Sequence, residues 1–347
     1  MTTETDLREL LKTVLGGVYT FERELGGGGM SRVFVATETA LGRRVVVKVL
    51  PPELSGAISA ERFRREVQLA ARLQHPHIVP LLAAGDTADA GDRRDSTRAG
   101  SGLLYYTMPY VAEESLRGRL AREAQLPVVD AVRIACDVAD ALAYAHALGV
   151  VHRDIKPENI LLDGRHALVA DFGIAHAMER AAGVALTLTS TGIALGTPRY
   201  MSPEQAAAER EIDGRSDVYS LGVVLYEMLA GEPPFGGPTA QAVIARMLTE
   251  STPSVRRARA SVPEAVERAV TRALSKVPAD RFQTAAEMRA ALEDALGGAV
   301  AVGSAGTPGE TRRLQGLPGE RGHAPRRRLL LAAVAVLALA LVGATAW

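Results

Sequence analysis

A run of four glycines lies near the start of the chain, and a lysine follows it within an apolar, β-branched segment. The glycines are Gly26, Gly27, Gly28 and Gly29, and the lysine is Lys48. Glycine lets a backbone approach a phosphate closely and adopt dihedral angles that other residues avoid. A lysine inside a strand faces either water or an anion. Two interpretations fit: a phosphate-binding loop with its cation, or a glycine-rich hairpin turn beside a solvated lysine.

Three further segments carry polar side chains that could complete a phosphate site. Glu66 falls on an expected helix, where its carboxylate either meets the Lys48 ammonium or faces solvent. Residues 152–159 read His-Arg-Asp-Ile-Lys-Pro-Glu-Asn and follow another expected helix. Residues 171–173 read Asp-Phe-Gly and follow an expected strand over residues 167–170.

The order of these motifs resembles that of a eukaryotic-type protein kinase of the bacterial membrane serine/threonine class. The resemblance covers residues 19–294 and implies transfer of the γ-phosphoryl group of ATP to serine and threonine hydroxyls of proteins. It implies ATP and Mg²⁺ as cofactors, with Mn²⁺ as an alternative ion. The implied catalytic residues are Lys48, Glu66, Asp154, Lys156, Asn159 and Asp171.

Phosphoryl transfer needs positioning and charge neutralisation more than covalent help from the protein. By this resemblance, Lys48 binds the α- and β-phosphates and pairs with Glu66. Asn159 and Asp171 hold Mg²⁺ through oxygen atoms, as a hard cation prefers.

On the substrate side, the resemblance makes Asp154 the group that accepts or orients the hydroxyl proton. Lys156 stabilises the γ-phosphate, and a lysine there is typical of kinases that act on serine and threonine. Only four of the 40 basic residues are lysines, namely Lys12, Lys48, Lys156 and Lys276. Two of them, Lys48 and Lys156, occupy implied catalytic positions. A compact ammonium presents its charge differently from a planar guanidinium.

The implied nucleotide site combines the glycine-rich segment with a hinge segment. Its residues are Leu25, Gly26, Gly27, Gly28, Gly29, Met30, Ser31, Arg32, Val33, Lys48, Met108, Pro109, Tyr110 and Val111. Ser31 stands where the family pattern has a third glycine. With Met108 as the gatekeeper, adenine would use the Pro109 carbonyl as an acceptor, since proline offers no N–H.

Residues 174–200 resemble an activation loop regulated by autophosphorylation, although a plain polar loop is the alternative. The expected phosphorylation sites are Thr189 and Thr191, with Thr187 and Ser190 as alternatives. A phosphate adds nearly two negative charges, and Arg153 is its expected partner. Thr197 is expected to contact Asp154 and Lys156 as part of the peptide-substrate platform.

Two polar contacts are expected to be structural. Glu204 should pair with Arg281, and Asp217 should brace the segment that carries the catalytic aspartate.

Composition limits the functions that remain. Forty basic and 40 acidic residues leave a net charge of zero, which gives no whole-chain attraction to nucleic acid. The hydrophobic fraction of 47% is ordinary for a folded protein. Cys136 is the single cysteine, so no internal disulfide can form, and no Cys/His cluster has zinc spacing. We expect a reducing compartment and a metal-free scaffold.

The fold expected is α+β and bilobal. The N-lobe, about residues 19–110, should hold an antiparallel sheet and one helix over residues 60–73. The C-lobe, about residues 111–294, should be mainly helical. Residues 1–18 form an N-terminal extension.

A strand-like apolar run at residues 78–82 and another at 103–108 flank a polar stretch. The stretch, residues 86–102, is therefore expected to be a long hairpin loop between two strands.

The C-terminal residues predict a membrane anchor. Residues 295–328 are rich in glycine, proline and arginine and read as a flexible juxtamembrane linker. Residues 329–347 carry no charge and follow three arginines; as a helix they span roughly 28 Å, close to a bilayer core. A buried core helix is the alternative. The arginines favour a single-pass protein at the cell membrane with a cytoplasmic kinase domain, and residues 1–20 lack the apolar run of a signal peptide.

Two other functions remain open. A pseudokinase scaffold would share the fold but is expected to lack a catalytic residue, and a small-molecule phosphotransferase would not need the peptide platform. The expected partners are protein substrates and the membrane, with no nucleic acid, and the terminal helix could support a homodimer.

Overall fold

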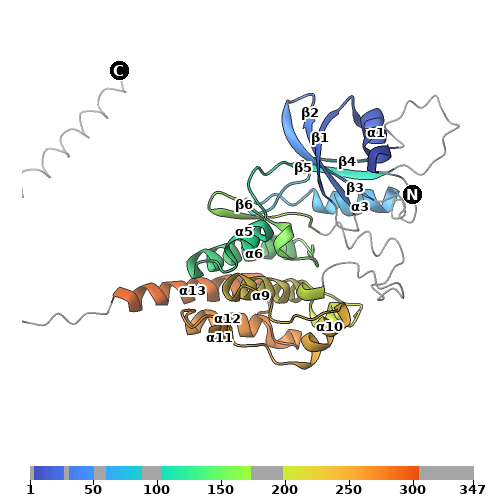
Figure 1. Ribbon diagram of the computed structural model, residues 1–347. Coiled ribbons are helices and arrows are strands. Elements are labelled where there is room, and N and C mark those ends of the chain that lie inside the picture. The colour runs from blue at the N-terminus through green and yellow to red at the C-terminus, as the bar shows by residue number, and fades with distance from the viewer. Residues whose placement is uncertain (1–3, 27–30, 51–59, 88–102, 173–197, 305–347) are drawn as a thin grey trace, which may run out of the picture. The chain divides into compact units, whose positions relative to one another are not determined.

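The computed structural model describes residues 4–26, 31–50, 60–87, 103–172 and 198–304 (Figure 1). The N-lobe holds one antiparallel sheet with the strand order β1-β2-β3-β5-β4. The strands are β1 (Tyr19–Gly26), β2 (Arg32–Glu38), β3 (Arg43–Val49), β4 (Ala83–Asp86) and β5 (Leu104–Pro109). The glycine-rich segment thus connects β1 to β2, as the sequence predicts.

A helix covers each face of this sheet. Side chains alternate along a strand, and in β3 the residues Val45, Val47 and Val49 join the cluster that contains α1 (Glu4–Leu15). Val46 packs on the other face, with α3 (Ala60–Ala70). The same alternation directs Lys48 to the α3 face.

The N-terminal extension is part of the N-lobe. Leu7, Leu11 and Leu15 recur every four residues, which aligns them along one side of α1. All three are buried in one cluster with Phe21 and Phe34 of the sheet.

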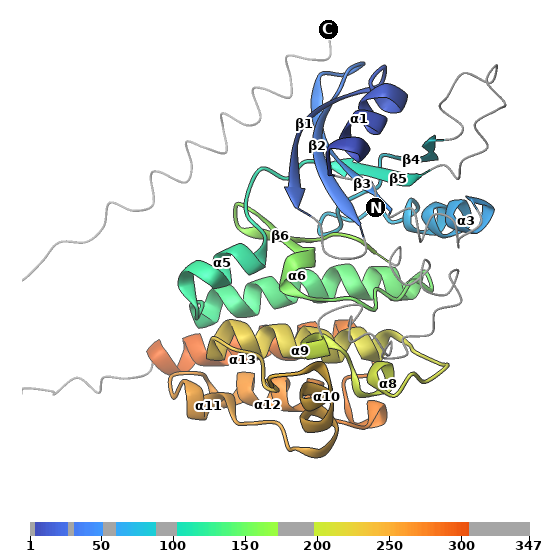
Figure 2. The same ribbon diagram turned by 45° about the vertical axis from the view of Figure 1, so that its right-hand side comes forward.

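The C-lobe is mainly helical, as expected, and forms layers below the sheet. Its helices are α5 (Leu116–Glu123), α6 (Val128–Ala147), α8 (Pro203–Ala206), α9 (Gly214–Ala230), α10 (Ala240–Thr249), α11 (Val255–Ala258), α12 (Glu264–Ala273) and α13 (Ala285–Ser304). Figure 2 shows α6 between the N-lobe and α9. Helix α9 is buried along nearly its whole length, and it is the centre of the C-lobe core.

A short hairpin lies between α6 and the activation segment. Strands β6 (Ile160–Asp163) and β7 (His166–Val169) pair antiparallel. They follow a single 3₁₀ turn, Pro157–Asn159, and end at Val169. The hairpin therefore holds Asn159 at one end and leads directly to Asp171 at the other.

Three element boundaries differ from the expectation. The strand expected at residues 78–82 lies instead at β4, and Ile78 makes only one parallel bridge, to Val169 of β7. Helix α3 ends at Ala70 in a turn. Helix α13 continues to Ser304, past residue 295, where the linker was expected to begin; buried Leu292 and Ala295 hold it against the core.

The predicted membrane segment, residues 329–347, lies outside the described residues, as do the greater part of the linker and nearly all of the 86–102 loop. Among the described helices, none combines the length and apolar composition needed to cross a bilayer.

Candidate active site

Lys48 is the second-last residue of β3, with Val33 of β2 and Tyr106 of β5 as its neighbours across the strands. Its ammonium forms an ion pair with the carboxylate of Asp171, which follows β7. The two side chains are only 17% and 13% exposed. This ion pair connects a strand of the N-lobe to the segment that follows the β6–β7 hairpin.

The Asp171 carboxylate has a second partner in the N-lobe. Tyr106 donates its hydroxyl to Asp171 Oδ1 at 2.9 Å. Burial acts to raise the pKa of Asp171, but the charge and hydrogen bond of Lys48, with the Tyr106 hydroxyl, hold this pKa below its ordinary value. Asp171 is therefore an anion at neutral pH. Its φ of +66° lies in the left-handed region, which is costly for a residue with a side chain and is typical of functional sites.

Asp154, Lys156 and Asn159 form a hydrogen-bonded group after α6. Lys156 Nζ lies 2.7 Å from Asp154 Oδ2, and Asn159 Nδ2 lies 3.0 Å from the same oxygen. Asn159 Nδ2 also donates to the Asp154 carbonyl at 2.8 Å. The carboxylate is thus held in one orientation by two donors, while part of it stays open to solvent.

His152 connects this group to the segment that carries Asp171. Its Nε2 lies 2.9 Å from the carbonyl oxygen of Ala170, so Nε2 carries the proton. Its Nδ1 accepts the Asp154 N–H at 3.2 Å. The ring of Phe172 packs edge-on against His152, with centroids 4.7 Å apart. One buried imidazole therefore positions the backbone beside both aspartates.

Asp217 on α9 braces the same loop, as predicted. Its carboxylate accepts the N–H groups of His152 at 2.8 Å and Arg153 at 2.7 Å, and lies 2.8 Å from His146 Nε2. Burial acts to raise the pKa of Asp217, but these contacts, His146 foremost, lower it below the ordinary value. Arg153 has a φ of +68°, and the two N–H bonds at this turn help to stabilise that conformation.

The residues expected to bind Mg²⁺ fit a hard cation. The Ala170 N–H donates to the Asn159 carbonyl at 2.9 Å, which brings Asn159 beside the residue that precedes Asp171. Because Asn159 Nδ2 donates to Asp154, the amide oxygen is the atom left for a ligand. An amide oxygen and a carboxylate form the kind of all-oxygen donor set that Mg²⁺ prefers.

The predicted adenine-binding side is apolar. Met108 of β5 is buried in one cluster with Val46 and Ala170, and Val33, Tyr110, Val111 and Leu161 pack against that cluster. These residues come from β2, β3, the hinge, β6 and the residue that follows β7. They offer an apolar surface of the kind that a purine ring requires.

Several predicted residues lie outside the described part. These are Gly27, Gly28, Gly29, Met30, Thr187, Thr189, Ser190, Thr191 and Thr197. Glu66 lies on α3, but its side chain is outside the description. Its pairing with Lys48 stays a prediction.

Sequence reasoning missed two contacts. Tyr106 gave no signal because its contact with Asp171 depends on the register of β3 and β5. Gln205 donates from Nε2 to the Arg153 carbonyl at 2.7 Å and closes a capping box with Ser202 on α8. A serine followed three residues later by glutamine is a readable sign of that cap.

The pairing of Glu204 with Arg281 is confirmed. The guanidinium of Arg281 binds both carboxylate oxygens of Glu204, at 2.7 and 2.8 Å, and Arg281 is fully buried. Arg281 also donates to the carbonyls of Arg215, Ser275 and Lys276. The pair ties the start of α8 to the segment before α13.

Comparison with known proteins agrees with this geometry. Residues 19–293 match the protein kinase domain. Serine/threonine-protein kinase PknB of Mycobacterium leprae is 44% identical over 272 residues, which are 77% of this chain and 41% of that protein. PknB of Mycolicibacterium smegmatis is 43% identical over 276 residues, covering 79% and 42%. The chain thus spans less than half the length of these relatives.

Solved structures show the same likeness. The kinase domain of Mycobacterium tuberculosis PknI aligns with a TM-score of 0.60 at 30% identity, covering 80% of this chain and 96% of that one. By its matched domain, its relatives and its two-lobed architecture, the chain belongs to the protein kinase family.

Proposed function

We propose that the chain is a serine/threonine protein kinase that transfers the γ-phosphoryl group of ATP to protein hydroxyls. The observation that carries this proposal is the hydrogen-bonded group of Asp154, Lys156 and Asn159, together with the Lys48–Asp171 ion pair. The names of the relatives support serine and threonine as the acceptor residues.

In the proposed reaction, Asp154 accepts the proton of the substrate hydroxyl. The hydroxyl oxygen bonds to the γ-phosphorus while the bond from that phosphorus to the β–γ bridging oxygen breaks, and ADP leaves. Lys156, already 2.7 Å from Asp154, neutralises charge on the transferred group. Lys48 binds the α- and β-phosphates, and Glu66 pairs with it.

Asn159 and Asp171 would hold Mg²⁺, with Mn²⁺ as an alternative. The ion supplies charge neutralisation at the phosphates when bound. Asp171 keeps a low pKa through its contacts with Lys48 and Tyr106, so it offers a charged ligand without first losing a proton. Tyr106, whose own pKa is raised well above its ordinary value by burial and by Asp171, remains a hydroxyl donor.

Transfer from γ-labelled ATP tests the proposal. The full chain is incubated with Mg²⁺ and a generic basic protein, beside Asp154→Asn and the control Asp163→Asn, which changes an exposed aspartate of β6. Label on serine or threonine that is lost only in Asp154→Asn supports a protein kinase. A folded, ATP-binding chain that transfers no label would instead be a pseudokinase. Label that reaches only small molecules would indicate a small-molecule phosphotransferase.

The activation segment extends this proposal to regulation. Thr189 and Thr191, with Thr187 and Ser190 as alternatives, are the proposed autophosphorylation sites. Arg153 would bind the phosphate, and Thr197 would contribute to the peptide platform. Arg153 immediately precedes the proposed catalytic Asp154. A phosphate that binds Arg153 would therefore act on the position of this aspartate.

A single membrane span over residues 329–347, with the kinase domain in the cytoplasm, is the proposed location. The support is the uncharged run of 19 residues after three arginines. The full chain should sediment with membranes and a chain ending at residue 328 should not; equal partition of both would refute the anchor. The span would also raise the local concentration of kinase domains for a homodimer.

A further inference from the structure

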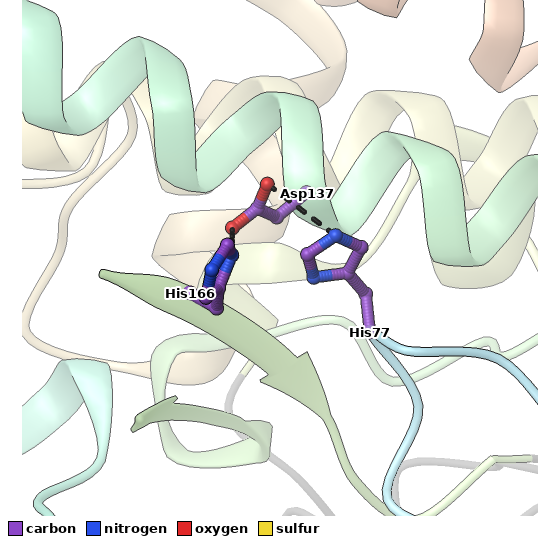
Figure 3. A group of neighbouring side chains, drawn as sticks. All are labelled: His77, Asp137 and His166. Carbon is purple, nitrogen blue, oxygen red and sulfur yellow. Dashed lines mark ion pairs between the residues drawn. The ribbon is translucent and has the colours of Figure 1, made fainter. Parts of the chain in front are cut away.

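Two histidines and an aspartate that have no role in the proposed reaction converge on one place (Figure 3). His77 lies in the connection between α3 and β4, Asp137 on α6, and His166 at the start of β7. One ring nitrogen from each histidine and a carboxylate oxygen of Asp137 all lie within 4.8 Å of one another. Among the residues that the structure describes, this is the one group of at least three such side chains that could hold a metal ion.

We propose that His77, Asp137 and His166 form a binding site for a divalent transition-metal ion, with Zn²⁺ as the first candidate. Imidazole and carboxylate together suit zinc and its neighbours in the first transition row. Magnesium and calcium prefer sets of oxygen ligands. The site therefore differs in chemistry from the all-oxygen pair Asn159 and Asp171.

The distances between the three side chains favour an ion over direct hydrogen bonds. His77 Nε2 lies 3.6 Å from Asp137 Oδ1, and His166 Nδ1 lies 3.8 Å from Asp137 Oδ2. Both exceed the range of a good hydrogen bond. Ligand atoms around a tetrahedral zinc, with bonds of about 2.0–2.1 Å, stand roughly 3.3 Å apart. The two histidine–aspartate separations exceed that spacing by only a few tenths of an ångström, and the three ligand atoms lie within 4.8 Å of one another.

The backbone of β7 orients two of the three ligands. His77 Nδ1 lies 2.9 Å from the carbonyl oxygen of Ala167, so this nitrogen carries the proton in the neutral ring and Nε2 keeps the lone pair that a metal needs. Asp137 Oδ2 accepts the Ala167 N–H at 2.9 Å. Such outer contacts are typical of metal-ligating histidines and carboxylates.

His166, the third ligand, is exposed, so its ring can move toward the ion and the ion can enter from solvent on its side. His166 is 70% exposed, whereas His77 and Asp137 are each 15% exposed. An exposed imidazole can rotate toward an ion without disturbing the core. Three protein ligands leave one position of a tetrahedron for water.

An ion at this place would link the connection after α3 to the C-lobe. That connection already lies on β7, because Val169 N–H donates to the His77 carbonyl and Val79 N–H to the Val169 carbonyl, both at 2.9 Å. A bond from His77 to a metal held by α6 and β7 would fasten it more firmly. Spacing along the chain does not reveal this group, since the three residues come from separate segments.

Calorimetric titration of the full chain with Zn²⁺, in excess Mg²⁺ to occupy oxygen sites, tests the proposal. One ion should bind per chain. His166→Ala removes an exposed side chain and should leave the fold intact, and Asp137→Asn removes the charged ligand. Loss of a mere outer-shell partner costs about 10–100-fold in metal affinity. Because each variant changes a direct ligand, its affinity for Zn²⁺ should fall by more than about 10-fold. The control His75→Gln changes a neighbouring histidine near Asp140 and keeps all three ligands.

Co²⁺ gives a second readout. A tetrahedral site with nitrogen and oxygen ligands should produce visible absorption bands in the wild type and in His75→Gln, and these should be lost in His166→Ala. Zinc affinity that is unchanged in His166→Ala, or no binding of one equivalent by the wild type, would overturn the proposal. Equal weakening in His75→Gln would assign the ion to another site.

Discussion

Lys48 and Asp171 stand 123 positions apart in the chain and form an ion pair between β3 and the end of the β6–β7 hairpin. The contact depends on the alternation of β3, which buries Val47 and Val49 toward α1 and leaves Lys48 on the face that meets the C-lobe. It places a cation beside a proposed Mg²⁺ ligand. In the proposed kinase, the Lys48 ammonium binds the phosphates of ATP and the Asp171 carboxylate binds the metal ion.

Replacing this lysine should abolish phosphoryl transfer while leaving the fold intact. Lys48→Met removes the charge that would bind the α- and β-phosphates, and it leaves the Asp171 carboxylate without its cation. The pKa of Asp171 should rise, because burial then acts with less opposition. Transfer of label from ATP is the measurement. Lys12→Met is the control, since Lys12 is exposed and forms an ion pair with Glu9 one turn away. A folded Lys48→Met with normal activity would contradict the assigned role.

Asp217 should affect turnover more than nucleotide binding, because it touches the catalytic loop and not the substrate. The two oxygens of Asp217 accept the N–H groups of His152 and Arg153, one each. In Asp217→Asn one of these oxygens becomes an N–H₂ group, which cannot accept a hydrogen bond. A shift of the loop by about 1 Å should lower kcat about 10–100-fold, with a much smaller change in the KM for ATP.

The same substitution at Asp213 provides the matched control. Asp213 is the N-cap of the same helix, and its side chain accepts the Arg215 N–H. Asparagine is an equally good N-cap, so Asp213→Asn should keep kcat. Unchanged turnover in Asp217→Asn, or equal loss in both variants, would show that Asp217 does not position the loop.

The Glu204–Arg281 pair should be strongly coupled in stability. Each of Glu204→Gln and Arg281→Met leaves one buried charge without its partner, which should cost about 3–5 kcal/mol in the free energy of unfolding. The double variant should lose less than the sum, because neither charge is then left alone. Denaturant unfolding of the four proteins measures the coupling, and additive losses would contradict it.

This pair also predicts a pH dependence. Burial acts to raise the pKa of Glu204, but Arg281 and Ser216 hold it below the ordinary 4.5. A depressed carboxyl pKa adds stability above the unfolded value, and that stability is lost as the pH falls through the folded value. Between pH 5 and pH 3, wild-type stability should therefore fall more steeply than that of Glu204→Gln.

The sequence predicts a contact best when the residues that make it lie close together in the chain. Asp154, Lys156 and Asn159 sit in one short motif, so their proximity is encoded by spacing. The strand β4 reads Ala-Ala-Gly-Asp and lacks strand-forming residue types, whereas the β-branched pair Ile78 and Val79 is buried through its contact with β7. Composition alone therefore favoured the wrong segment.

Contacts between distant segments were out of reach where the family resemblance did not supply them, as it did for Glu204 with Arg281. The approach of Tyr106 to Asp171 depends on strand register, and the group of His77, Asp137 and His166 depends on how a loop, a helix and a hairpin pack. The expectation of a metal-free scaffold considered only cysteine and histidine spacing along the chain. Such spacing cannot detect ligands that tertiary structure brings together.

The activation segment predicts control by phosphorylation. Without phosphate at residues 189 and 191, Arg153 has no added charge to bind there, and Thr189→Ala with Thr191→Ala should slow phosphorylation of an added substrate. Since a phosphate forms one to three charge-assisted hydrogen bonds, the rate should fall about 10-fold or more. Thr13→Ala, on exposed α1 surface, is the control. Equal rates in all proteins would mean that these threonines do not regulate the enzyme.

Helix α1 should contribute directly to the stability of the N-lobe, and adjacent leucines allow a matched test. Leu11 is fully buried against the sheet, while Leu10 is 43% exposed. Leu11→Ala should lower the free energy of unfolding by about 2–5 kcal/mol, because it removes buried methyl groups and leaves a cavity. Leu10→Ala deletes the same atoms from the surface and should change it by no more than about 0.5 kcal/mol. Equal effects of the two substitutions would mean that α1 does not pack on the sheet in solution and does not stabilise the N-lobe.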